Sequence, residues 1–268
     1  MAPVTCPSGP GARGNRTTAR QTGGVTDDGA QQRVAGRVPG AAALGLLAPP
    51  SASVVPGVLL ADPAWTAQVL TDRAARQRTG DRRVLATVWW YSVSSVLFTP
   101  VLAGLVTGVG LSARLEDTRL HVLAGHTPVG ATTCAGSGLD VAGDLRTTIA
   151  AVVAAVAEAG AMRAQPLWAI ATDSLANRLL ALGRAVGDVT AATALAGPLA
   201  AAVGAPLPSP RYVDVARPSG GTVRFTRRAS CCLLYRVPHE VLCTSCPRRP
   251  PGERLVLLED TAQRMREA

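Results

Sequence analysis

Four cysteines near the carboxyl end are the residues whose type and spacing best suit a defined chemistry. Cys231, Cys232, Cys243 and Cys246 follow the pattern C-C-x10-C-x2-C within residues 227–254. A C-x2-C turn directs two thiolates towards one metal, and a second pair of thiolates completes a four-sulfur site. Neighbouring residues of a strand face opposite ways, so Cys231 and Cys232 share one metal only if the backbone turns there. Otherwise they approach a two-metal cluster from different sides, which suits a [2Fe–2S] unit with two thiolates on each iron.

Two other kinds of site are compatible with the same stretch. A zinc ion bound by the four cysteines would stabilise a small C-terminal lobe, although zinc sites usually present two C-x2–4-C elements. His239 lies between the two cysteine pairs and can replace a cysteine, as histidines do in Rieske-type centres. A disulfide scaffold is excluded, because six cysteines in 268 residues are sparse and four of them crowd into 16 residues. Cys6 is interpreted as incidental, and Cys134 with His126 matches no metal-ligand spacing.

The cysteine pattern resembles the C-terminal motif of the FhuF-like ferric siderophore reductases. That family places an Arg-Arg pair shortly before the motif and a Tyr-Arg pair shortly after its first two cysteines. In this chain the corresponding residues are Arg227-Arg228 and Tyr235-Arg236. The resemblance therefore covers the residues around the cysteines as well as the cysteines themselves.

A weaker similarity to the same family extends into the middle of the chain. Residues 88–104 (VWWYSVSSVLFTPVLAG) resemble the family's small-residue helix and its Ser/Thr-Pro-Val-Leu step. Residues 166–179 (PLWAIATDSLANRL) resemble its Pro-Leu-Trp helix start, with Ala169-Ile170 where the family often has Gly-Asn. This departure weakens any ligand role for the second segment.

The resemblance implies a ferric-siderophore reductase with a [2Fe–2S] cluster bound by Cys231, Cys232, Cys243 and Cys246. Such an enzyme transfers one electron to siderophore-chelated Fe(III) and releases Fe(II), which the hard oxygen donors of the chelate hold poorly. Its partners would be a ferric siderophore and an electron-donor protein, with no nucleic acid. No Gly-rich turn between a strand and a helix is seen, so directly bound NAD(P)H is not expected. The resemblance indicates no catalytic residue, and a non-catalytic iron–sulfur redox sensor remains an alternative, as does the zinc site.

The charge of the chain bears on the same region. All 27 basic residues are arginines, against 18 acidic residues, which gives a net charge of +9. Residues 224–254 contain seven arginines and two glutamates. These arginines can raise the potential of an anionic cluster, form a solvated surface, or dock an acidic donor or an anionic chelate. With no visible secretory signal, we expect a cytoplasmic protein, and transient association with the cytoplasmic face of the inner membrane stays open.

The composition predicts the fold class and the domains that must position the cysteines. Apolar residues make up 47% of the chain and aromatic residues only 3%, which favours packed helices over a sheet sandwich. We therefore expect an α-rich α+β fold with a few short strands. Residues 1–40 are rich in Gly and Pro and are predicted to be disordered. Residues 41–205 should form a mainly helical domain, and residues 206–268 a small C-terminal cysteine-rich, iron–sulfur-binding lobe.

Apolar periodicity predicts the individual elements. Helices are expected over residues 62–79, around Leu145–Val156, over 168–186 with a stop at Gly187, and over 190–203. Residues 84–113 carry no charge, but Pro100 divides them into pieces too short to span a membrane, so a buried helical hairpin is expected. Strands are predicted at residues 118–124, 212–216 and 222–226. Residues 41–61 and 125–138 are predicted to be irregular, and His121 is interpreted as a core or edge histidine.

Overall fold

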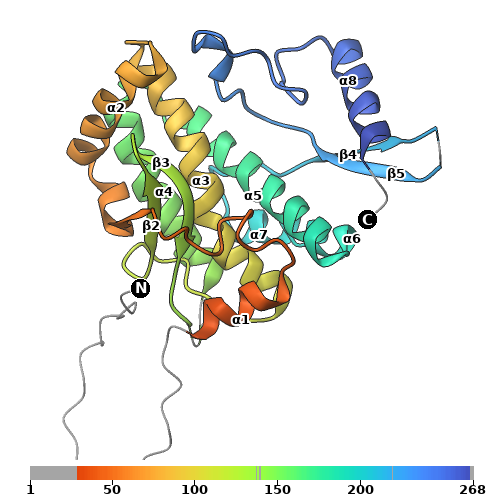
Figure 1. The fold of residues 1–268 in the computed structure, drawn as a ribbon, viewed down its shortest axis with the longest axis horizontal. Helices are drawn as coiled ribbons and strands as arrows, with labels where there is room; N and C mark the ends of the chain where they lie inside the picture. The colour runs from red at the N-terminus through yellow and green to blue at the C-terminus, as the bar shows by residue number, and fades with distance from the viewer. Residues whose placement is uncertain (1–28, 137, 139, 219, 266–268) are drawn as a thin grey trace, which may run out of the picture.

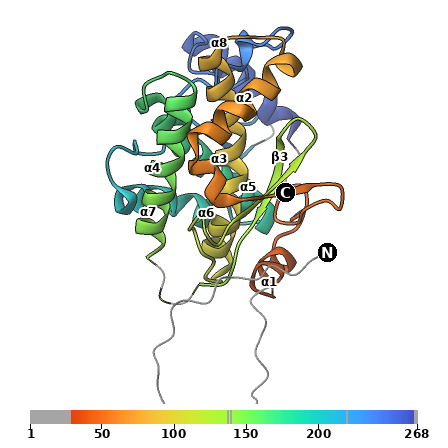
Figure 2. The ribbon, with the colours of Figure 1, turned by 90° about the vertical axis from the view of Figure 1, so that its left-hand side faces the viewer.

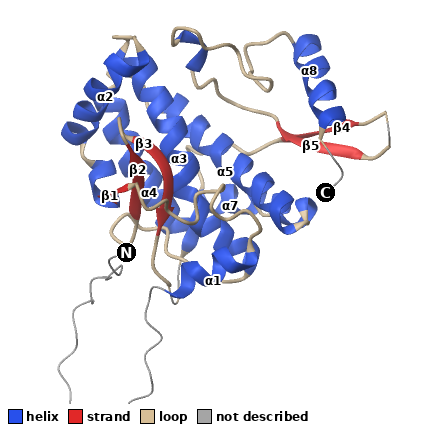
Figure 3. Cartoon of the chain, viewed as in Figure 1, coloured by secondary structure: helices blue, strands red, loops and turns tan. Residues whose placement is uncertain are grey.

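The computed structural model describes residues 29–136, 138, 140–218 and 220–265. The described chain is an α-rich α+β fold, as predicted, with two small sheets (Figure 3). The helices are α1 (Gly29–Arg37), α2 (Pro63–Gln77), α3 (Arg82–Thr107), α4 (Val141–Ala159), α5 (Gln165–Val186), α6 (Val189–Ala194), α7 (Ala196–Val203) and α8 (Pro251–Arg264), with 3-10 turns η1 (Gly57–Ala61) and η2 (Leu234–Arg236). One antiparallel sheet has the order β1 (Ser53–Pro56), β2 (Arg119–Leu123), β3 (Thr127–Thr132). The other pairs β4 (Tyr212–Ala216) with β5 (Thr222–Thr226).

Helix α3 is the central element of the helical body, the part of the fold formed by α1 to α7 and the three-stranded sheet (Figures 1 and 2). It packs against α5 along much of its length, and it also contacts α1, α2, α4 and β3. Trp89, Trp90 and Phe98 are fully buried in its core. The Trp90 indole N–H donates to the Leu167 carbonyl at 2.8 Å, which fixes α3 to the start of α5. Burial on several sides therefore decides where this helix lies.

The expected hairpin over residues 84–113 is wrong, because α3 continues through Pro100. A proline inside a helix costs about 3 kcal/mol through a lost hydrogen bond and a steric clash. Packing of the surrounding elements on α3 outweighs this cost. By length and composition α3 is the one described helix that could cross a membrane, and 61% of its most apolar window is buried inside the fold. The length and apolar composition of a buried core helix can equal those of a membrane-spanning helix.

Most other predicted elements are confirmed. Asp62 caps α2 by accepting from the backbone N–H groups of Ala64 and Trp65. Helices α4 and α5 lie where periodicity placed them, and α5 ends at Gly187 in the left-handed region at φ 80°. The helix expected over 190–203 is divided at Leu195 into α6 and α7. Strands β2, β4 and β5 match their predicted positions within a residue.

The N-terminal segment departs from the prediction. Residues 29–40 were expected to be disordered, but residues 29–37 form α1, and Val34 is fully buried against the core. Gln31 explains this, because its amide donates to the Leu46 and Ala131 carbonyls, both at 2.9 Å, and accepts from the Thr133 N–H at 2.7 Å. Residues 1–28, with Cys6, lie outside the described residues.

Two segments predicted as irregular contain regular structure. Residues 41–61 include β1 and η1, and residues 125–138 include β3. The strands β1 and β3 pair on either side of β2. Strand β3 forms a hairpin with β2, whereas β1 pairs with residues far away in the sequence, with Ser53 opposite Val122. Local composition does not reveal the pairing of β1, because its partner strand lies far away in the sequence.

The cysteine lobe, residues 211–265, lies to one side of the helical body (Figure 1). The β4–β5 hairpin contacts α5 and α8. A small apolar group between the hairpin and α8 consists of Val215, Val223, Leu258 and Ala262. A second group joins Val237 of the lobe to Val84 and Val88 at the start of α3. The position of the domain boundary between residues 205 and 206 stays a prediction.

Candidate functional site

The four cysteines of the C-C-x10-C-x2-C motif line one pocket between the lobe and α3. We call this the cysteine pocket; its cavity measures about 50 Å³. Its walls are formed by Tyr91, Arg228, Cys231, Cys232, Leu234, Tyr235, Val241, Leu242, Cys243 and Cys246. All four carry free thiols. The predicted ligand residues are therefore brought together, although 10 residues separate the two pairs in the sequence.

The cysteines lie in two groups, and one group is enclosed by the other along the sequence: Cys231 lies with Cys246, and Cys232 lies with Cys243. Cys231 Sγ lies 3.9 Å from Cys246 Sγ. Cys232 and Cys243 share a different neighbour, because Arg228 Nη1 lies 3.9 Å from the Cys232 sulfur and 3.4 Å from the Cys243 sulfur. Each half of the motif thus contributes one cysteine to each pair.

The backbone explains why adjacent cysteines face different partners. Leu233, directly after Cys232, lies in the left-handed region at φ 60°, where the chain turns into η2. Two thiolates on one tetrahedral metal with bonds of about 2.3 Å lie about 3.8 Å apart, close to the Cys231–Cys246 separation. Among the described residues, no group of three or more His, Cys, Asp or Glu side chains is close enough to hold a single ion. A [2Fe–2S] cluster has two irons that each take two thiolates, so two pairs of cysteines can hold it.

Arg228 is the buried charge beside the second pair. Its side chain is 2% exposed, its guanidinium stacks 4.9 Å above the Tyr91 ring, and Nε donates to Asp173 at 3.4 Å. Burial lowers the pKa of Arg228, but Tyr91, Cys232 and Asp173 outweigh burial and raise it above its ordinary value, so the guanidinium stays charged. Its Nη2 group is buried without a hydrogen-bond acceptor among the described residues. A buried donor of this kind beside two sulfurs fits an anionic metal–sulfur group.

Asp173 on α5 anchors the segment that leads into the first cysteine pair. Its carboxylate accepts from the Ala229 N–H at 2.7 Å, the Ser230 N–H at 3.0 Å and the Ser230 hydroxyl at 2.7 Å. Because Asp173 is itself 2% exposed, these hydrogen bonds and Arg228 must compensate its buried charge. The carboxylate therefore sets the position of Cys231 and Cys232 relative to the body.

Burial also changes the pKa values of two of the cysteine thiols. It raises the pKa of Cys231 to about 11 and raises that of Cys243, the latter opposed by the nearby Arg228. Burial likewise raises the pKa of Tyr91, so its phenol stays neutral. Thiols with raised pKa values are protonated at neutral pH, and metal binding here must release protons.

Several residues singled out in the sequence lie outside the cysteine pocket. His239 is exposed on the surface of the lobe and does not line the pocket, which leaves the Rieske-type alternative without support. Arg236 is 50% exposed and pairs with Asp81 at 3.7 Å. His121 is a buried histidine of β2 hydrogen-bonded to Thr132, as expected for a core position. Cys134 is buried in the body.

Sequence reasoning missed Asp173 and Tyr91. Asp173 stands between Thr172 and Ser174, and all three lie in the part of α5, residues 167–176, in which every residue is buried. Ser174 pairs with Ser94 of α3 at 2.7 Å. A single charged residue within the mostly apolar run 167–176 is the signal that could have identified the anchor, because such residues are buried only with partners.

Residues 228–248 match the family model of the FhuF 2Fe-2S C-terminal domain. The match begins at Arg228 and includes the four cysteines, which confirms the recognised family motif. No curated protein matches the chain. The cofactor of the matched domain is a [2Fe–2S] cluster, and the match relates this iron–sulfur protein to siderophore iron metabolism. The similarity suggested for residues 88–104 and 166–179 stays a prediction.

Proposed function

We propose that this protein is a ferric-siderophore reductase whose [2Fe–2S] cluster is held by Cys231, Cys232, Cys243 and Cys246. The observation that carries the proposal is the gathering of these thiols in one pocket within the matched residues 228–248. The grouping of the cysteines suggests that Cys231 and Cys246 hold one iron, and Cys232 and Cys243 the other.

The cluster would supply a one-electron carrier to this site. One electron passes to the chelated Fe(III), which becomes Fe(II), and an electron-donor protein replaces that electron. No covalent bond of the siderophore has to break, because its hard oxygen donors hold the softer, less charged Fe(II) poorly. The fold positions the four cysteine sulfurs, and the Arg228 guanidinium places a positive charge beside two of them.

The exposure of the thiols supports direct electron transfer to a bulky chelate. Cys232 and Cys246 are buried, whereas Cys231 and Cys243 are partly exposed. One side of the cysteine pocket therefore lies near the protein surface, and a chelate can approach it without entering the core. We further propose that the reaction occurs in the cytoplasm, with transient contact to the inner membrane near the point of siderophore import.

A spectroscopic titration tests the proposal. Protein isolated under anaerobic conditions should be brown, should lose visible absorption on reduction with dithionite, and should regain it when a ferric siderophore is added. We expect one Fe(II), trapped by a colorimetric chelator, for each electron that the protein loses. Reduced protein that stays reduced in the presence of the chelate would indicate a redox sensor, and colourless protein with bound zinc would indicate a structural site. Either result would overturn the proposal.

A further inference from the structure

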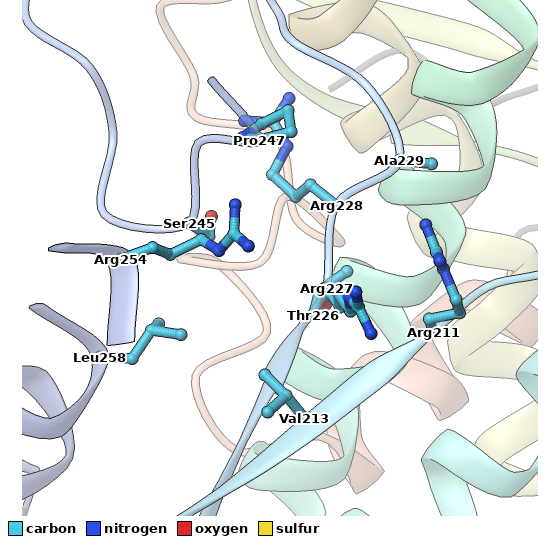
Figure 4. Close-up of a pocket in the computed structure, with 10 residues that line it drawn as sticks. All are labelled: Arg211, Val213, Thr226, Arg227, Arg228, Ala229, Ser245, Pro247, Arg254 and Leu258. Carbon is cyan, nitrogen blue, oxygen red and sulfur yellow. The ribbon is translucent and has the colours of Figure 1, made fainter. Parts of the chain in front are cut away.

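A second cavity, of about 250 Å³, lies beside the cysteine pocket (Figure 4). We call it the basic pocket and define it by the arginines that line it, Arg211, Arg227, Arg228 and Arg254. Strand β4, the segment after β5, the C-x2-C loop and α8 form its walls. Figure 4 shows these arginines around a shared space together with Ser245.

Three of the four arginines of the basic pocket have no carboxylate partner in the described part of the chain, whereas Arg228 pairs with Asp173. None of the residues that line it is acidic. Among the described residues, no carboxylate lies within ion-pair distance of Arg211, Arg227 or Arg254. Other arginines of the lobe are paired, such as Arg224 with Asp214 at 2.8 Å. Gathering several cations in a concave site is unfavourable unless an anion compensates them, and guanidinium groups bind oxygen anions through charge-assisted hydrogen bonds.

The basic pocket also shares residues with the cysteine pocket. Arg228 lines both cavities. Arg254 Nη1 lies 3.4 Å from the Cys246 carbonyl oxygen, its acceptor, and Ser245 directly precedes that cysteine. An anion held by Arg254 would therefore lie beside the C-x2-C loop that carries Cys246.

On the premise of the proposed reductase function, we infer that the basic pocket binds the anionic oxygen-donor edge of a ferric chelate. Ferric chelates differ in charge: three hydroxamates neutralise Fe(III), whereas three catecholates leave an excess of three negative charges. The cavity is smaller than a typical site for a whole drug-sized ligand of about 300–1,000 Å³, so it would receive one arm of the chelate. The protein should therefore select catecholate chelates over neutral trihydroxamate chelates.

Binding of redox-inert gallium chelates to the cluster-containing protein tests this inference. We expect gallium tris-catecholate to bind at least about tenfold more tightly than a neutral gallium trihydroxamate in calorimetry. The difference should shrink as the salt concentration rises, because salt screens charge. Arg254→Gln and Arg211→Gln should each weaken catecholate binding severalfold and so reduce the ratio between catecholate and trihydroxamate affinities. Arg264→Gln is the matched control, because it removes the same charge from an α8 side chain that is 70% exposed.

Each outcome separates the inference from the proposed function. Equal binding of the two gallium chelates, or arginine variants that bind like the unaltered protein, would overturn the inference. Reduction of both ferric chelates at equal rates would leave the reductase function intact and overturn the selectivity. Charge-selective binding without reduction would support the basic pocket and overturn the reductase. If neither chelate binds, but an acidic donor protein binds and depends on Arg254, the pocket docks the donor and the inference fails.

Discussion

The helical body and the cysteine lobe are stabilised in different ways. The body buries a continuous apolar core that extends from α1 to α7 and includes Trp89 and Trp90. Among its described residues the lobe buries two small apolar groups, one between β4, β5 and α8 and one against the start of α3. It is also joined to the body by polar contacts, among them the hydrogen bonds that Asp173 accepts from residues 228–230.

The difference indicates how the two regions respond to change. Apolar burial is distributed over many residues, so the body should tolerate the loss of single contacts at its edges. The lobe depends on a few specific groups, and metal binding contributes directly to the folding free energy of such small units. Substitutions in the lobe should therefore disturb its order while the helices of the body persist.

The largest effect is expected from Cys243→Ser. A hydroxyl is a weaker iron ligand than a thiolate, so we expect the protein to lose its cluster and the lobe to become sensitive to protease. The helical circular dichroism of the body should change little. Iron and sulfide analysis, with limited proteolysis, measures both effects. Thr244→Ser is the adjacent control and should keep the cluster; full iron content in Cys243→Ser would contradict the ligand assignment.

Asp173→Ala should cost about 3–5 kcal/mol of unfolding free energy, because it leaves Arg228 buried without its counter-ion. Urea unfolding measures the cost, and hydrogen exchange should show faster exchange at residues 229–232. Asp188→Ala is the control, because Asp188 only caps α6 and its loss should cost about 1 kcal/mol. Equal effects of the two substitutions would show that Asp173 does not anchor the lobe.

Gln31→Leu tests the stability of the helical body separately from that of the cysteine lobe. It leaves the Leu46 and Ala131 carbonyls and the Thr133 N–H without their partner, which should lower the unfolding free energy by about 2–4 kcal/mol. Cluster content should not change. Gln68→Leu, on the exposed face of α2, should have little effect on thermal unfolding. Loss of the cluster in Gln31→Leu would mean that the two regions are more tightly coupled than their contacts suggest.

The smallest effect concerns the midpoint potential. Arg228→Gln removes a buried positive charge beside the sulfurs and should lower the potential by about 50–100 mV, equivalent to roughly 1–2 kcal/mol of charge interaction. Arg236→Gln removes an exposed charge paired with Asp81 and should leave the potential nearly unchanged. Redox titration followed by electron paramagnetic resonance compares them. Equal shifts would show that net charge, rather than the position of Arg228, sets the potential.

The sequence predicts those features of the fold that depend on local pattern. The apolar period of α4 and α5, the Asp62 cap and the Gly187 stop all act within a few residues, and the structure confirms them. The errors have a common cause. Gln31 orders α1 through contacts to residues up to 102 positions away, and Pro100 is tolerated in α3 because neighbouring elements bury it. Composition and spacing carry no information about such contacts.

The sequence by itself determined that four thiols occur at a spacing suited to a metal–sulfur centre and that a mainly helical region precedes them. Only the tertiary structure decided that Cys231 lies beside Cys246 and that Arg228 is buried while Arg236 is exposed. It also decided that several arginines line a second cavity. The physical reason is that burial and pairing depend on neighbours in space. Asp173, for example, meets Arg228 across 55 positions of the chain.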